Sequence, residues 1–103
     1  MSNKETKLIL IDVKDLSLEK EQNVEDLLRF LTEQLPQIEL SRATNTIEVK
    51  MPLKMSKRAI KLRLKKFLHQ KNLKEKYRPI MYKTEDREGY MIKEKKVIEL
   101  SYY

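Results

Sequence analysis

The spacing of apolar residues changes several times along the chain, and each change predicts the start of a new helix or strand. Residues 7–13, KLILIDV, form a run rich in Leu and β-branched residues, which predicts a buried strand. The polar stretch 17–22, SLEKEQ, predicts a loop. In residues 24–35 the apolar side chains recur at the spacing of one helical face, and Asn23 precedes them as the expected N-cap. Pro36 is expected to end this helix.

Two alternating segments come next. Ile38 and Leu40 alternate with polar residues, and Ile47, Val49 and Met51 do so again after the polar turn SRATNT. Alternation with a period of two is typical of strands that bury one face. The two segments therefore predict a β-hairpin.

Residues 56–78, SKRAIKLRLKKFLHQKNLKEKYR, return to a helical period. Ser56 is the expected N-cap and Asn72 the expected end. On a helical wheel the large apolar side chains fall within about 100° of one another; they are Ile60, Leu64, Phe67 and Leu68. A second stripe, roughly 100–180° from Ile60, is basic and consists of Arg58, Lys61, Lys65 and His69. We expect one face in the core and the other in solvent.

The C-terminal quarter predicts further strands. Residues 80–85 form one, DREG (86–89) is a turn signal, 90–96 are ambiguous, and the alternation in 97–103 predicts a last strand. No linker or repeat interrupts residues 1–103, so a single domain is expected. The element order β-α-β-β-α-β-β predicts an α+β fold in which two helices pack on an antiparallel sheet.

The charge is concentrated on one element. The chain carries a net charge of +7, yet residues 54–78 hold eleven Lys/Arg and one acid, while residues 1–53 have a net charge of −3. A basic charge confined to one element is typical of polyanion binders. An ordinary solvated helix is the alternative, but such helices interleave Glu with Lys, and residues 56–74 contain no acid. Repulsion among like charges then costs a few tenths of a kcal/mol per pair, which phosphates would offset.

Residues suited to catalysis are scarce. The chain has no Cys, one Gly and one His, so it offers no disulfide, thiol nucleophile, Cys-ligated zinc or glycine-rich phosphate loop. His69 stands alone on the basic helix and is expected at the surface. We therefore expect no enzyme activity, no catalytic or metal site, no cofactor and no small-molecule substrate. The chain also shows no apolar run near the ~20 residues of a membrane span and no signal peptide, which predicts a soluble cytoplasmic protein without a membrane partner.

The segment SKRAIKLRLKKFLHQKNL closely resembles the basic helix of the eukaryotic-type large-subunit ribosomal protein twenty-two family. The matching blocks are Ser56-Lys57-Arg58, Ile60-Lys61-Leu62, Lys65-Lys66, Phe67-Leu68 and Asn72-Leu73. The resemblance continues upstream without a gap through Ile47-x-Val49, Leu53 and Ser56. Weaker matches lie in the same order elsewhere, at Leu10-x-Asp12, Asn23-x-Glu25-x-Leu27-Leu28 and Ile98-Glu99-Leu100-x-Tyr102-Tyr103. The family's lysine-rich N-terminal and acidic C-terminal tails are absent, Ala59 replaces an aromatic, and residues 83–96 are longer than the family's hairpin.

This resemblance implies a cytoplasmic ribosomal protein of translation, bound to large-subunit ribosomal RNA beside neighbouring ribosomal proteins. The expected mechanism is neutralisation of phosphates by Lys57, Arg58, Lys61, Lys65 and Lys66. Arg63, Lys71 and Arg78 are expected as flanking contacts. Two rival functions would use the same helix: a free-standing regulator that inserts it into a DNA major groove, and an interaction domain for an acidic protein.

Overall fold

The computed structural model describes residues 5–95, so the strand predicted at 97–103 lies outside the described residues. The elements are β1 (Thr6–Asp12), α1 (Lys14–Glu19), α2 (Glu21–Gln34), β2 (Glu39–Arg42), β3 (Thr46–Pro52), α3 (Lys57–Gln70), β4 (Tyr77–Lys83) and β5 (Glu88–Glu94). The predicted α+β class is confirmed.

The five described strands form one sheet in the order β2-β3-β1-β5-β4. The predicted hairpin is confirmed as β2 and β3, with Leu40 opposite Val49. β1 pairs antiparallel with β3, and β4 with β5, but β1 and β5 run parallel. The expectation of a wholly antiparallel sheet was therefore wrong at its centre. Apolar alternation marks which face of a strand is buried, but it carries no information on the direction of a partner about 80 residues away.

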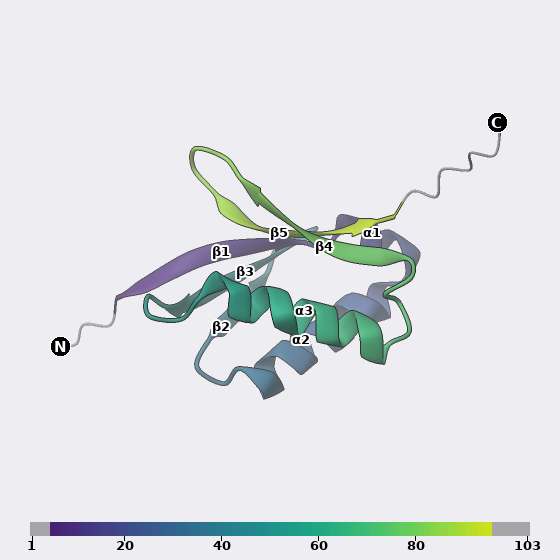
Figure 1. Ribbon diagram of the computed structural model, residues 1–103, viewed down its shortest axis with the longest axis horizontal. Helices are drawn as coiled ribbons and strands as arrows, with labels where there is room; N and C mark the ends of the chain where they lie inside the picture. Colours follow the sequence, from purple (N-terminus) through teal and green to yellow (C-terminus); the bar gives the residue numbers. More distant parts are fainter. Residues whose placement is uncertain (1–4, 96–103) are drawn as a thin grey trace.

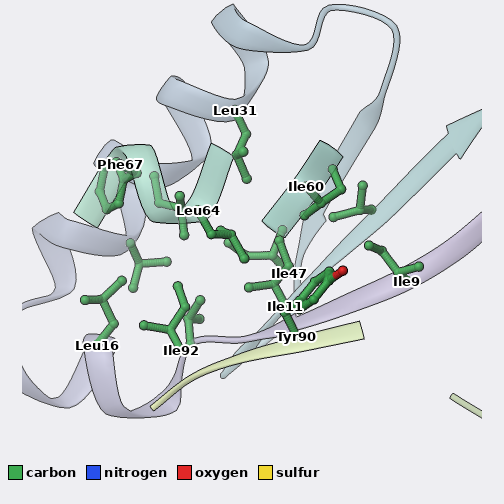
Figure 2. Packing of buried hydrophobic residues seen from close by; sticks show 14 of the residues in the cluster. Ile9, Ile11, Leu16, Leu31, Ile47, Ile60, Leu64, Phe67, Tyr90 and Ile92 are labelled. Atoms are coloured by element: carbon green, nitrogen blue, oxygen red, sulfur yellow. The ribbon is translucent and has the colours of Figure 1, made fainter. Parts of the chain in front are cut away.

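The helices lie on one face of the sheet. Figure 1 shows α2 and α3 along the same side, with α1 at the end of the sheet. Between the layers, β1, β3 and β5 bury Ile9, Ile11, Ile47 and Ile92 against Leu64 of α3 (Figure 2). Nearly full removal of such side chains from water is worth roughly 1.5–3 kcal/mol each. The core therefore fixes α3 firmly on the sheet.

Two details of the first helical region differ from expectation. Residues 17–22 do not form a loop, because α1 includes Lys14–Glu19 and α2 begins at Glu21. Leu16 anchors the short α1 with no exposed surface. Asn23 lies inside α2, whose N-cap is Lys20 without a side-chain hydrogen bond. The prediction from Pro36 is confirmed, since α2 ends at Gln34.

Both ends of α3 follow from local sequence. The Ser56 hydroxyl accepts a hydrogen bond from the Arg58 N–H at 3.0 Å, which confirms the predicted N-cap. Asn72 adopts a left-handed φ of 63°. The Leu73 N–H donates to the Leu68 carbonyl at 2.7 Å, and the Asn72 N–H donates to the His69 carbonyl at 3.1 Å. This pair of bonds is a Schellman motif, so Asn72 ends the helix as predicted.

Candidate nucleic-acid interface

The side of α3 that faces solvent is held in place by the side that faces the core. Ile60, Leu64, Phe67 and Leu68 are all buried, as their spacing predicted. Phe67 also packs against Phe30 of α2, with ring centroids 5.5 Å apart. The 14 residues of α3 span about 21 Å. Cations on its outer side are therefore presented along a rigid line.

Four of the predicted RNA-binding residues lie along this side of α3. Arg58, Lys65 and Lys66 are exposed, and Lys61 is half-buried. Within residues 5–95, none of the four forms a salt bridge. Leu62 lies among them with 48% of its surface exposed. We call Arg58, Lys61, Lys65 and Lys66 the basic stripe.

Lys57 and Lys71, at the two ends of α3, are instead engaged within the fold. The Lys57 amine lies 2.6 Å from a carboxylate oxygen of Glu88, and the Lys71 amine lies 2.6 Å from one of Asp26. These hydrogen bonds hold the pKa of the Glu88 and Asp26 carboxyls below their usual values. Part of the repulsion along α3 is thus offset inside the protein, whereas the cations of the basic stripe have no acidic partner within residues 5–95.

Arg63 lies beside the basic stripe, on the edge nearer the core. It is about 300° from Ile60 on the helical wheel, whereas the four residues of the basic stripe cover roughly 100–240°. Its side chain is half-buried, and its Nε is buried without a hydrogen-bond partner in the described part of the chain. Arg63 therefore flanks the basic stripe, and its half-buried side chain is less accessible than the exposed Lys66 beside it.

A groove of about 350 Å³ adjoins the basic stripe where α3 ends beside β4. Lys65 of α3 and Arg78 of β4 both line it, so the fold brings together two predicted contacts. Lys74 and Lys95 line it as well. Lys74 belongs to the basic segment 54–78, but no local signal marks Lys95. The backbone places it there, because its N–H donates to the Lys76 carbonyl at 2.8 Å.

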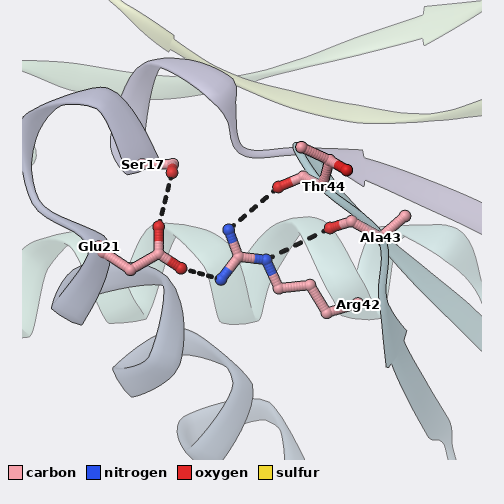
Figure 3. A network of polar contacts seen from close by, with 5 residues as sticks. All are labelled: Ser17, Glu21, Arg42, Ala43 and Thr44. Atoms are coloured by element: carbon pink, nitrogen blue, oxygen red, sulfur yellow. Dashed lines mark hydrogen bonds and ion pairs between the residues drawn. The ribbon is translucent and has the colours of Figure 1, made fainter.

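Two further cations, Arg42 and Lys76, are paired with the acids of α1 and α2. Figure 3 shows the Arg42 guanidinium donating to the Glu21 carboxylate and to the carbonyls of Ala43 and Thr44, while the Ser17 hydroxyl donates to Glu21 at 2.8 Å. The hydrogen bond from Arg42 is the main cause that lowers the pKa of Glu21. The Lys76 amine lies 2.7 Å from Glu19. These pairs join elements of the fold, whereas the cations of the basic stripe and of the groove form no salt bridge within residues 5–95.

Other kinds of site are not evident among residues 5–95. No three His, Cys, Asp or Glu side chains gather there in a way that could hold a metal ion. No helix in that range is both long and apolar enough to cross a membrane. A larger groove of about 630 Å³ lies at the other end of the sheet, beside Leu53 and Pro52, and no residue of the basic stripe lines it.

In comparisons with known proteins, no family model and no curated protein matches the chain.

Proposed function

We propose that this protein binds structured ribosomal RNA and is a structural constituent of the large ribosomal subunit in the cytoplasm. The observation that carries the proposal is the basic stripe, whose cations lie on the outer side of a rigid helix without acidic partners in residues 5–95. The resemblance of residues 56–73 to the ribosomal protein family supplies the ribosomal part. Its partners would be ribosomal RNA and adjacent ribosomal proteins.

The composition of the basic stripe favours RNA shape over DNA sequence as the recognised feature. Three of its four residues are Lys, which offers a point charge rather than the bidentate fork that reads guanine. No Asn or Gln precedes His69 in α3, so the first turns carry no side chain suited to adenine. Contacts to phosphates position a protein on a duplex without reading its bases. We therefore expect selection by phosphate density and A-form geometry.

A competition experiment tests this proposal. A labelled ribosomal RNA hairpin is bound to the full chain, and structured ribosomal RNA fragments or duplex DNA of equal length are added at one salt concentration. Ribosomal RNA should displace the hairpin much better than DNA. Equal displacement by arbitrary DNA would reduce the activity to generic polyanion binding, and preferential displacement by one DNA sequence would favour the regulator.

Co-sedimentation separates the ribosomal role from the DNA-binding regulator and from the interaction domain. The full chain should sediment with large subunits at moderate salt, and the variant Lys61→Gln/Lys65→Gln should do so less. A matched variant, Lys14→Gln/Lys50→Gln, removes two positive charges from α1 and β3 and should sediment like the unaltered protein. Failure to sediment with subunits, combined with capture by an acidic protein, would support the interaction domain instead.

A further inference from the structure

We infer that the groove between α3 and β4 receives one unpaired nucleotide of the bound RNA. This inference rests on the proposed function, because the groove begins at Lys65, which also belongs to the basic stripe. RNA lying along the basic stripe would continue directly over the groove. What the groove adds is a concave surface, which the convex side of a helix cannot provide.

The rim of the groove suits the phosphates on either side of such a nucleotide. Glu75 is the single acid among the residues that line the groove, against four cations: Lys65, Lys74, Arg78 and Lys95. All four cations are exposed, and none takes part in a salt bridge within residues 5–95. They come from four separate segments: α3, the turn after it, β4 and the residue that follows β5. The fold therefore brings four cations from distant parts of the sequence to one depression.

The floor of the groove suits a base better than a phosphate. It is formed by Leu68, Tyr77 and Pro79. Leu68 and Tyr77 lie almost completely buried beneath it, with 1% and 2% of their surface exposed, so the apolar surface open to a base is mainly the half-buried Pro79 ring. A volume of about 350 Å³ lies at the lower end of the roughly 300–1,000 Å³ typical of small-molecule sites. An unstacked base can lie against such a surface, whereas a paired base stays inside its duplex.

Hydrogen bonds hold the walls of the groove in place. The Tyr77 N–H donates to the Leu73 carbonyl at 2.9 Å, and the Leu73 N–H donates to the Leu68 carbonyl at 2.7 Å. The Tyr77 hydroxyl donates to the Glu19 carboxylate, away from the groove. These hydrogen bonds hold Tyr77 in place beneath the groove, so the groove does not depend on bound RNA for its shape. A preformed site avoids the cost of ordering side chains on binding.

The experiment compares three RNA hairpins that differ only at mid-stem. One has a continuous stem, one carries a single bulged uridine, and one carries an abasic residue as the bulge. Dissociation constants for the full chain are measured by fluorescence anisotropy at one salt concentration. The uridine bulge should bind about fivefold or more tightly than the continuous stem, in line with one base placed on a protein surface. The abasic bulge, which has the same phosphates and flexibility, should lack this gain.

Variants of the cations that line the groove then test whether the higher affinity for the uridine bulge arises there. Lys74→Gln/Lys95→Gln should abolish the preference for the uridine bulge, whereas Lys14→Gln/Lys50→Gln should retain it, with equal thermal stability in both. Equal affinity for the uridine and abasic bulges would overturn the inference, as would a preference that survives in Lys74→Gln/Lys95→Gln. Tight binding of the continuous stem in these cases would leave the proposed function intact, and absence of binding to all three hairpins would overturn both.

Discussion

Gly89, the only glycine of the chain, occupies a point of the sheet where no side chain fits. It lies on β5 opposite Leu10 of β1, in the parallel pair at the centre of the sheet. A Cβ added there would be 1.8 Å from the Leu10 carbonyl oxygen, well inside van der Waals contact. Backbone atoms cannot move aside without disturbing both strands. The requirement at this position is thus steric, since no glycine in the described chain has a positive φ.

Gly89→Ala should therefore destabilise the protein by about 1–3 kcal/mol, the usual cost of overpacking. Ser41→Ala, on the exposed face of the edge strand β2, serves as the matched strand control and should change stability little. Urea denaturation of both variants measures the difference. Full stability of Gly89→Ala would mean that β1 and β5 lie further apart than the structure shows.

Tyr77 makes stability depend on alkaline pH. Burial raises the pKa of its phenol above the ordinary value of 10.0, and the hydrogen bond to Glu19 raises it further. A group with a raised folded-state pKa contributes stability that is complete below its unfolded pKa and is lost as pH rises toward the folded pKa. Tyr77→Phe should cost about 1–2 kcal/mol at pH 7, for a lost bond to a charged group. This difference should shrink as pH rises above 10 in chemical denaturation, and a difference independent of pH would contradict the assignment.

Single residues also show where sequence patterns stop being informative. Ser56 and Asn72 bounded α3 correctly because caps depend on neighbours within a few positions. The ion pairs of Lys57 and Lys71 could not be foreseen, because Glu88 and Asp26 lie 31 and 45 residues away in the chain. The basic segment was therefore visible in the sequence, while the subset of its cations left for a ligand was not.

At the scale of elements, α3 separates folding from binding on its two faces. Leu64→Ala and Phe67→Ala remove buried volume and should each destabilise the protein by roughly 2–5 kcal/mol. Lys61→Ala and Lys65→Ala should leave stability nearly unchanged, or raise it slightly, and should weaken RNA binding. Thermal melts and RNA titrations of the four variants test this division. Unfolding of the Lys variants with a stable Leu64→Ala would show that the faces were assigned the wrong way round.

Elements with a strong period were predictable, and those without one were not. The apolar spacing of 24–35 and the alternation of 38–51 indicated α2 and the β2–β3 hairpin correctly. The predicted loop at 17–22 covered half of α1, because a six-residue helix with one fully buried side chain, Leu16, leaves no visible period. The parallel pairing of β1 and β5 depends on tertiary packing. The groove could not be predicted for the same reason, because one of its cations, Lys95, is placed there by the position of β5 in the sheet.

Over the whole molecule, charge is divided between the two helical regions. Residues 14–34, which contain α1 and α2, hold six acids and three Lys/Arg, whereas α3 holds six Lys/Arg and no acid. Acids of the first region pair with Arg42, Lys71 and Lys76. This pairing neutralises acids of the first region, whereas the cations of the basic stripe and the groove form no salt bridge within residues 5–95. Such an asymmetry orients a polyanion before contact, and salt screens it.

The salt dependence of binding should therefore report how many cations meet phosphates. The basic stripe and Arg78 provide five, so for a continuous RNA stem the slope of log affinity against log salt should be about −4 to −5, if the coefficient for duplex DNA applies. Filter binding from low to moderate salt measures this slope. Lys61→Gln/Lys65→Gln should make the slope about two units shallower, and Lys14→Gln/Lys50→Gln should leave it unchanged. A slope near zero for the unaltered protein would contradict the electrostatic mechanism, since phosphate contacts release counterions whichever RNA helix is bound.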